Sequence, residues 1–507
     1  MISRSFAMTN TYKSALEAIF ISPSRLDARG RRYWIFWIVA FYVIGLVHWT
    51  LFFDLGQIKF NVHDWGLTAH YLLGLEQAVT TGQLPLHVIP ETPFHQTERF
   101  LTNPDLPVSP QVLLIPLLGL GRFVLVDTLF LYSLGFLGLY LLAKRLKLSS
   151  FSFAMLFILF GFNGHVTSHL GVGHIVWEGY FLTPFVVLLI FVAAERGPDR
   201  RWPVLMSLAL FAILLQGAFH FVIWTALLLV LLALTQASIR RPAIVAVILT
   251  VALGAFRFVP AAFEFTTPES SFIGGFKSVG DILIGLSTFM TPIEAANEHY
   301  GPPEWWELDY YVGMLGLGFL AVFGIFSWLR QSNSPDRRPV RVLAPALIVM
   351  TFLSLDIIFR AIANLPIPFI GAERVSSRFF LLPFLFLILF SVMALQRWLN
   401  SQRLSTGIRM LLLAGLIAIA LDLWQHSRVW RPSAVQLGFE VFSPNLFVSI
   451  VNRPDPAYVN ALIAGTAITA IALIYCAWRL FRAPKQMTAS VEATEQELAA
   501  ESRSEDQ

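Results

Sequence analysis

The chain has 507 residues, of which 56% are hydrophobic and only 13% charged, and its formal net charge is +4. This composition excludes a string of soluble domains, because membrane-length apolar runs recur from Tyr33 almost to Arg479. The basic residues are spread between these runs rather than clustered with aromatic residues, which argues against nucleic acid as a partner. Cys476 is the single cysteine, so an intramolecular disulfide and a cysteine-based metal site are both excluded.

The N-terminal segment, residues 1–32, is polar, carries several arginines and lacks an apolar h-region. We therefore expect a cytoplasmic segment rather than a cleaved signal peptide. The apolar runs that follow predict about twelve transmembrane helices within one integral membrane domain, residues 33–480. The predicted spans are 33–53, 125–143, 150–163, 176–194, 203–217, 219–236, 242–260, 310–329, 342–359, 377–396, 408–424 and 456–479. The expected fold class is an all-α polytopic membrane protein.

Clusters of lysine and arginine alternate with these runs and set the expected topology. If each cluster faces the cytoplasm, both termini are cytoplasmic and the chain lies in the inner (plasma) membrane. The segment Leu106–Arg122 is apolar enough to insert, but a full crossing there would reverse every later loop. Its prolines and glycines favour a re-entrant or interfacial segment, with an extra crossing as the rival interpretation. The acidic tail, 481–507, is expected to be disordered.

The first outer loop, about 54–109, begins with Asp64 and an amphipathic stretch over 67–79. This stretch predicts a helix on the membrane surface that ends at Gly82 and Pro85. Such a helix can hold Asp64 at head-group level, where a lipid-linked substrate would lie and Asp64 can act as its base; the alternative is that Asp64 only caps this helix. Because it lies beside membrane surface, a raised pKa is expected for its carboxyl group.

The second outer loop, about 163–176, contains His165, His169 and His174, and Glu178 follows. Three imidazoles at this spacing can ligate a metal, bind phosphate or shuttle a proton. The intervening glycines argue against a regular helix that carries two histidines on one face. A polar hairpin between two spans is the simpler interpretation.

Two further outer regions carry candidate ligands for a sugar or an anion. Glu304, Trp305 and Trp306 offer a carboxylate and ring faces to a sugar, although the tryptophans also fit an interfacial aromatic belt. Arg374 and Arg378 precede a span on the outer side, against the positive-inside trend. They need an anionic partner, either a lipid-linked phosphate or a neighbouring acidic group. Arg257, near the outer end of its span, is a further phosphate candidate.

The arrangement resembles the GT-C superfamily of polytopic glycosyltransferases, which use polyprenyl-phosphate-linked sugars. The resemblance covers about residues 33–400: one N-terminal span, an early acidic residue (Asp64), a surface helix ending in Gly82-Gln83-Leu84-Pro85, and an Arg-bearing outer turn. Many members carry paired acidic residues in the first loop, whereas Trp65 and Gly66 follow Asp64 here. Whether the protein needs a divalent cation is therefore left open.

The resemblance implies an inverting sugar transfer on the extracytoplasmic face, from a polyprenyl-phosphate donor to a glycan, lipid or protein acceptor. Asp64 is the expected general base. The expected substrate- or phosphate-binding residues are His63, His165, His169, His174, Glu178, Arg257, Arg374 and Arg378. A secondary transporter or lipid flippase, and a non-catalytic membrane assembly protein, are the alternatives from other classes.

Overall fold

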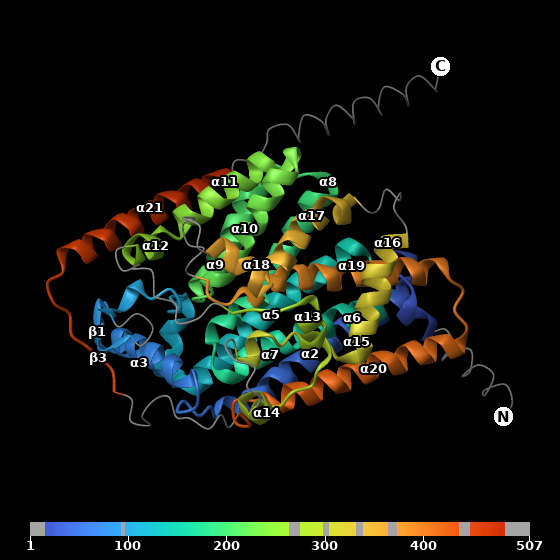
Figure 1. The fold of residues 1–507 in the computed structure, drawn as a ribbon, viewed down its shortest axis with the longest axis horizontal. Coiled ribbons are helices and arrows are strands. Elements are labelled where there is room, and N and C mark those ends of the chain that lie inside the picture. Colours follow the sequence, from blue (N-terminus) through green and yellow to red (C-terminus); the bar gives the residue numbers. More distant parts are fainter. Residues whose placement is uncertain are drawn as a thin grey trace, which may run out of the picture.

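The computed structural model describes residues 16–92, 97–262, 274–297, 304–330, 338–363, 373–435 and 447–481. Within these ranges the chain is helical almost throughout, with one small sheet. Helix α3 and strands β1 and β3 lie together at one end of the molecule (Figure 1). Nearly all of the predicted acidic tail, from residue 482 on, falls outside the described residues.

Long apolar helices make this a multi-pass membrane protein. Among the described residues, eight helical segments are long and apolar enough to cross a membrane. They are α2 (Ala28–Phe52), α5 (Leu120–Leu146), α6–α7 (Ser150–Val172), η5–α8 (Ile175–Arg196), α15–α16 (Gly313–Arg330), η10–α19 (Ser376–Ser401), α20 (Thr406–Val429) and α21 (Pro456–Phe481). The pair α11 (Ala237–Leu253) and α12 (Ala255–Ala261), bent by 70°, raises the number to nine if it forms one span.

The remaining predicted spans also fall on helices, but on shorter ones. These are α9 (Trp202–Leu215), α10 (Phe219–Thr235) and α17 (Arg338–Leu353), followed by α18 (Asp356–Ala363). The all-α membrane class is therefore confirmed, whereas the number of twelve crossings stays a prediction.

The segment 106–122 contains only two short helices before α5, namely η4 (Pro110–Leu114) and α4 (Ile115–Leu118). Gly119 then adopts a φ of 72° and breaks the chain direction before Leu120. Neither helix approaches the roughly 20 residues that a crossing needs, and Pro116 lies within the first turn of α4. This geometry fits a re-entrant or interfacial segment.

The first outer loop contains the predicted helix as α3 (Trp65–Thr81), and Gly82 ends it with a left-handed φ of 67°. A three-stranded sheet of order β2-β1-β3 follows. It consists of β1 (His87–Thr92), β2 (Thr97–Arg99) and β3 (Ser449–Ile450). Because β3 precedes α21, this sheet joins the segment after α2 to the segment before α21, which the sequence predicts to be the first and last outer loops.

An ion pair reinforces the same connection between distant loops. Arg99 Nε lies 2.7 Å from Asp455 Oδ2, and the Asn452 side chain accepts hydrogen bonds from the backbone of Leu86 and His87. The sheet therefore fixes the end of α3 to the start of α21.

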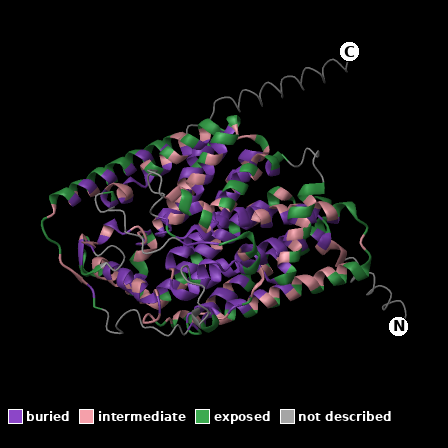
Figure 2. Ribbon diagram, in the orientation of Figure 1, coloured by how far each residue is buried: buried purple, intermediate pink, exposed green. Residues whose placement is uncertain are grey.

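Shorter elements complete the fold. They are η1 (Pro23–Arg25), η2 (Asp54–Gly56), η3 (Phe100–Thr102), α13 (Val279–Ser287), α14 (Pro292–Asn297), η6 (Trp305–Glu307) and the π-helical turn η7 (Leu320–Phe326). Buried residues fill the centre of the bundle, whereas α20 and α21 expose most of their outer surface (Figure 2).

Small residues let α5 approach its neighbours closely at the centre of the bundle. A Cβ added at Gly135 would lie 2.3 Å from the backbone oxygen of Phe181 in η5, and one at Gly138 would lie 2.7 Å from Pro184 in α8. Such small-residue contacts are typical of helix packing in membranes. They place η5 against α5 and thereby position the segment that contains Trp177.

We predict that Gly135→Ala destabilises the protein by about 1–3 kcal/mol, because the backbone of η5 must move to admit the methyl group. Gly161→Ala is the matched control, since no atom lies within 4 Å of a Cβ added there. Thermal unfolding in detergent measures both. Equal melting temperatures for the two variants would contradict the close approach of α5 and η5.

Candidate active site

Asp64 stands at the N-cap position of α3, but its side chain makes no capping hydrogen bond. Its Oδ2 atom instead lies 2.6 Å from Nε2 of His174 and 3.3 Å from Nδ1 of His63. The side chain is 32% exposed, so the carboxylate can still meet a ligand. Of the two roles considered for Asp64, capping is thus not the one that its side chain performs.

The backbone around Asp64 is fixed against the end of α7 (Gly164–Val172). Asp64 N donates to Val172 O at 3.1 Å, and Trp65 Nε1 donates to Gly171 O at 3.0 Å. Gly173 has a φ of 101°, and a Cβ there would lie 2.3 Å from Trp65 N. Only glycine meets both requirements, so Gly173 sets the distance between Asp64 and His174.

The expected raised pKa of Asp64 is wrong. Burial favours a higher pKa, but hydrogen bonds and charges from His174 and His63 outweigh it and hold the pKa well below its usual value. The reciprocal effect acts on His63: burial favours a lower pKa, yet Asp64 raises it above 6.5. Asp64 is therefore a carboxylate throughout the neutral range.

The predicted second outer loop is largely a helix. Asn163 caps α7 by accepting a hydrogen bond from Val166 N, and all nine residues of α7 are buried. His165 and His169 do lie on one helix, four residues apart, with ring centroids separated by 4.6 Å. The argument from glycine was wrong for Gly164 and Gly171, which both lie within α7. Gly173 ends α7 in a left-handed conformation, and a tight connection at Gly173 and His174 joins two candidate spans.

His169 and His174 are in direct contact through their Nδ1 atoms, 2.6 Å apart. His174 Nε2 carries a hydrogen, because it faces the Asp64 carboxylate at 2.6 Å. At the contact between the two Nδ1 atoms one imidazole donates and the other accepts, and His169 Nε2 lies 3.6 Å from Glu307 Oε2.

His169, His174 and Glu307 also offer ligand atoms that all lie within 4.8 Å of one another. Two imidazoles and a carboxylate are a donor set that suits zinc and similar divalent cations. This group fits a cation with modest side-chain adjustment, because the two Nδ1 atoms stand closer than ligands of one ion do. Neither a metal requirement nor metal independence follows from the geometry.

Beyond Glu307 the row of charged groups continues into the bundle. Arg378 forms a bidentate pair with Glu307, in which Nε lies 2.7 Å from Oε2, and it lies 4.9 Å from the centroid of the Trp177 ring. Arg378 Nη1 lies 3.4 Å from His220 Nε2 and 3.7 Å from Glu373 Oε1. The predicted need of Arg378 for an anionic partner is therefore met by two carboxylates of the chain itself.

Glu373 ends the row. It accepts hydrogen bonds from His220 Nδ1 at 3.0 Å and from Trp224 Nε1 at 2.9 Å. Burial favours a higher pKa for its carboxyl group, but the charges of His220 and Arg378 and these hydrogen bonds lower it to about 2. We refer to Asp64, His174, His169, Glu307, Arg378, His220 and Glu373 as the charged row.

The other predicted ligands lie apart from the charged row or beside it. Trp177 Nε1 and His165 Nε2 are 3.2 Å apart, and the His165 ring stacks on Tyr310. Glu178 is buried against α5, where the Thr128 hydroxyl donates to it, and Arg374 is exposed. His165 and Glu178 thus have their polar contacts away from Asp64.

Arg257 is buried and donates to the backbone oxygen of Asn103. Its Nη1 has no hydrogen-bond partner among the described residues. The Tyr71 hydroxyl of α3 lies within electrostatic range of Asp64, Asp105 and Arg257, and the Asn103 side chain donates to it. Arg257 and Asp64 thus approach the same tyrosine.

Trp305 and Trp306 are 1% and 4% exposed and pack with Trp430, Met290 and Val172. Their ring faces are unavailable to a sugar, and they do not form an interfacial belt either. Trp306 contacts the edge of the His63 ring at 4.6 Å, whereas Glu304 is exposed. Both tryptophans are therefore buried packing residues next to the site and do not bind a ligand through their ring faces.

Sequence reasoning did not assign roles to Glu307, Glu373 or His220. A histidine near the start of an apolar helix, such as His220 in α10, is a signal of function in a membrane protein and could have been found. The two glutamates lie far from Asp64 and His174 in sequence, and only the fold brings them together. A comparison with protein-family models, curated proteins and solved structures finds no match for this chain.

We predict that Glu307→Gln lowers the free energy of unfolding by up to about 3–5 kcal/mol, because it removes the bidentate partner of buried Arg378 and leaves only the longer contact with Glu373. Arg360→Gln is the control: it breaks the exposed Asp356–Arg360 pair, which contributes less than about 1 kcal/mol. Thermal unfolding in detergent compares them. A Glu307 variant as stable as the Arg360 variant would contradict a buried ion pair.

We also predict that part of the stability depends on pH through His63. Its pKa is raised in the folded protein, so its stabilising contribution is complete below about pH 6.5 and is lost as pH rises through the folded value. The melting temperature of the wild type minus that of His63→Gln should therefore decrease above pH 6.5. A difference independent of pH would exclude this coupling.

Proposed function

We propose that the chain is a membrane glycosyltransferase that transfers a sugar from a polyprenyl-phosphate-linked donor to an acceptor, with inversion, on the extracytoplasmic face. The observation that carries this proposal is the partly exposed, ionised Asp64, held by two imidazoles at the start of α3. A carboxylate that is fixed in position but open to a ligand has the properties of a general base.

In the proposed reaction, the acceptor hydroxyl donates a hydrogen bond to Asp64 and attacks the anomeric carbon. A bond forms from the acceptor oxygen to that carbon, and the bond from the carbon to the phosphate oxygen breaks. The proton passes to Asp64, and the polyprenyl phosphate leaves with the bonding electron pair. Since the phosphate ester already activates the donor, no nucleotide is required.

His63, just before α3, and His174, just after α7, hold the Asp64 carboxylate in one orientation. Their hydrogen bonds make the resting carboxylate a weak base. Proton transfer therefore has to accompany bond formation to the anomeric carbon, when the acceptor oxygen becomes strongly acidic. This proposal assigns positioning to the histidines rather than direct contact with phosphate.

The phosphate partner in this proposal is Arg257 rather than Arg378. Two carboxylates already neutralise Arg378, whereas Arg257 has an unpartnered Nη1 among the described residues and, like Asp64, acts electrostatically on Tyr71. Arg374 is exposed and can meet a lipid head group. The sugar and the acceptor are left open.

A proton-coupled transporter is a second candidate, favoured by one observation. The charged row carries ionisable groups from a half-exposed carboxylate to a buried one, as proton relays in membranes do. A transporter would depend on the inner groups, such as Glu373, at least as strongly as on Asp64.

We predict that Asp64→Asn reduces sugar transfer by about 10²–10⁴-fold, because the amide cannot take up the acceptor proton. Purified protein is incubated with a panel of polyprenyl-phosphate-linked sugars and acceptors, and release of polyprenyl phosphate is measured. Glu91→Gln, which changes an exposed carboxylate of the same outer loop, is the control and should retain activity. Undiminished release by Asp64→Asn would remove the proposal.

A further inference from the structure

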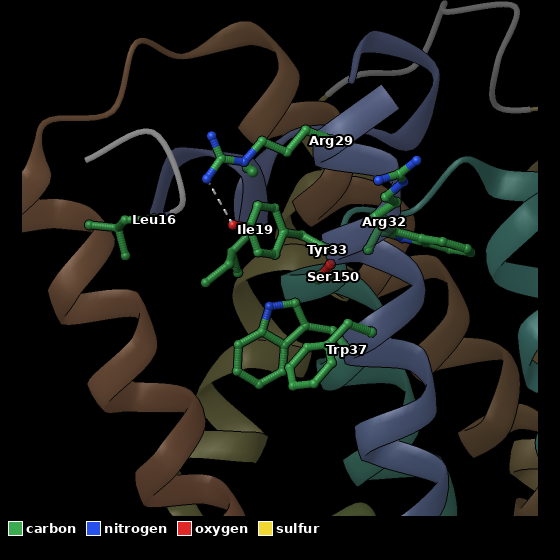
Figure 3. Close-up of a pocket in the computed structure, with 10 residues that line it drawn as sticks. Leu16, Ile19, Arg29, Arg32, Tyr33, Trp37 and Ser150 are labelled. Carbon is green, nitrogen blue, oxygen red and sulfur yellow. Dashed lines mark hydrogen bonds between the residues drawn. The ribbon is translucent and has the colours of Figure 1, made fainter. Parts of the chain in front are cut away.

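A pocket separate from the charged row lies at the opposite end of α2 from Asp64. Helix α2 has 25 residues, so its two ends are about 37 Å apart. The pocket has a volume of about 660 Å³ and is lined by residues 16–19, the first turns of α2 and Ser150 at the start of α6 (Figure 3). It is therefore separate from the candidate active site.

The walls of this pocket are held by specific contacts. Ser22 Oγ donates to Lys147 O at 2.8 Å, and Trp34 Nε1 donates to Leu148 O at 3.0 Å. The rings of Phe20 and Phe151 have centroids 4.8 Å apart. The segment before α2 is thus fixed to the α5–α6 turn, and the pocket between them is a built feature.

The charge of the pocket is positive and unbalanced. Arg29 and Arg32 lie at one end of it, and Arg29 Nη2 donates to the Tyr33 hydroxyl at 3.4 Å (Figure 3). Neither arginine forms an ion pair with a described carboxylate. The two acidic residues of this region are engaged elsewhere, since Glu17 pairs with Arg409 and Asp27 accepts a hydrogen bond from Gly30 N.

The other end of the pocket is apolar and faces the bilayer. Trp37 lies there (Figure 3), and the neighbouring Phe36 is 61% exposed. Of the most apolar 18-residue stretch of α2, only 28% is buried within the protein. Tyrosine and tryptophan beside arginine are typical of the membrane interface. A ligand of this pocket needs an anionic head and an apolar tail.

We propose that this pocket binds an anionic phospholipid, with its phosphate at Arg29 and Arg32 and the upper part of an acyl chain along Trp37. A volume of about 660 Å³ is within the range of small-molecule sites and holds a head group with part of one chain. The lipid belongs to the leaflet at the N-terminal end of α2, which the positive-inside pattern assigns to the cytoplasm. This proposal is independent of any transferase activity.

The test measures binding of phosphatidylglycerol and phosphatidylcholine to the purified full-length chain by native mass spectrometry in detergent. The double variant Arg29→Gln with Arg32→Gln should bind phosphatidylglycerol about 30-fold more weakly than the wild type, at about 1 kcal/mol per arginine. Phosphatidylcholine binding should differ little between the two proteins. The control, Arg200→Gln with Arg201→Gln, removes two exposed arginines outside the pocket and should bind as the wild type does.

Three results would overturn the proposal. One is equal affinity of the wild type for the two lipids, and another is equal weakening by the control pair. The third is a gain of at least tenfold in phosphatidylglycerol affinity after deletion of residues 1–15. That gain would mean that residues 1–15, rather than a lipid, occupy the pocket in the full-length chain. If the double variant has a lower melting temperature than the wild type in the absence of lipid, the single variant Arg32→Gln replaces it. This single variant should bind phosphatidylglycerol about fivefold more weakly than the wild type.

Discussion

The structure depends on the pairing of charged groups inside an apolar helix bundle. An isolated charge there costs several kcal/mol, so each member of the charged row has to meet an opposite charge or a hydrogen-bond partner. Glu307 occupies the centre, because it neutralises Arg378 on one side and borders His169 on the other. The segment around Asp64, η6 and η10 (Ser376–Phe380) are thereby tied together through side chains. Removing one member changes the electrostatic environment of the next, since interactions over a few ångströms exceed 1 kcal/mol where water is excluded.

Close backbone packing makes this row possible. Gly171 lets α7 approach Trp430, where an added Cβ would meet the backbone oxygen at 2.1 Å, and Gly164 lets it approach Asp309. Asp309 in turn pairs with His426 of α20 at 3.0 Å. Helix α7 is therefore enclosed on several sides, which fixes the side-chain orientation of His169. The partly exposed Asp64 is held against the end of this tightly packed helix.

Hydropathy predicted most of the fold, because burial of apolar helices in a bilayer leaves a strong local signal. The helix after Asp64 and its end at Gly82 followed from periodicity and from the left-handed conformation that glycine permits. Helix α7 was missed for a physical reason: Gly164, Gly171 and Gly173 suggest a loop when read locally, but close packing with distant segments requires all three. Arg378 was correctly expected to need an anion. Its partner Glu307 lies 71 residues away, and no sequence pattern specifies that pairing.

The low pKa of Asp64 constrains any reaction at this site. His63 and His174 stabilise the carboxylate, so protonation of Asp64 weakens both contacts at once. His63 also contacts Trp306, and His174 contacts His169. Each imidazole is therefore held by a second contact when its hydrogen bond to Asp64 weakens. A ligand that gives a proton to Asp64 therefore has to replace the lost interactions with its own. This requirement favours an acceptor whose oxygen loses its proton only while a new bond forms, and it disfavours simple equilibrium protonation near neutral pH.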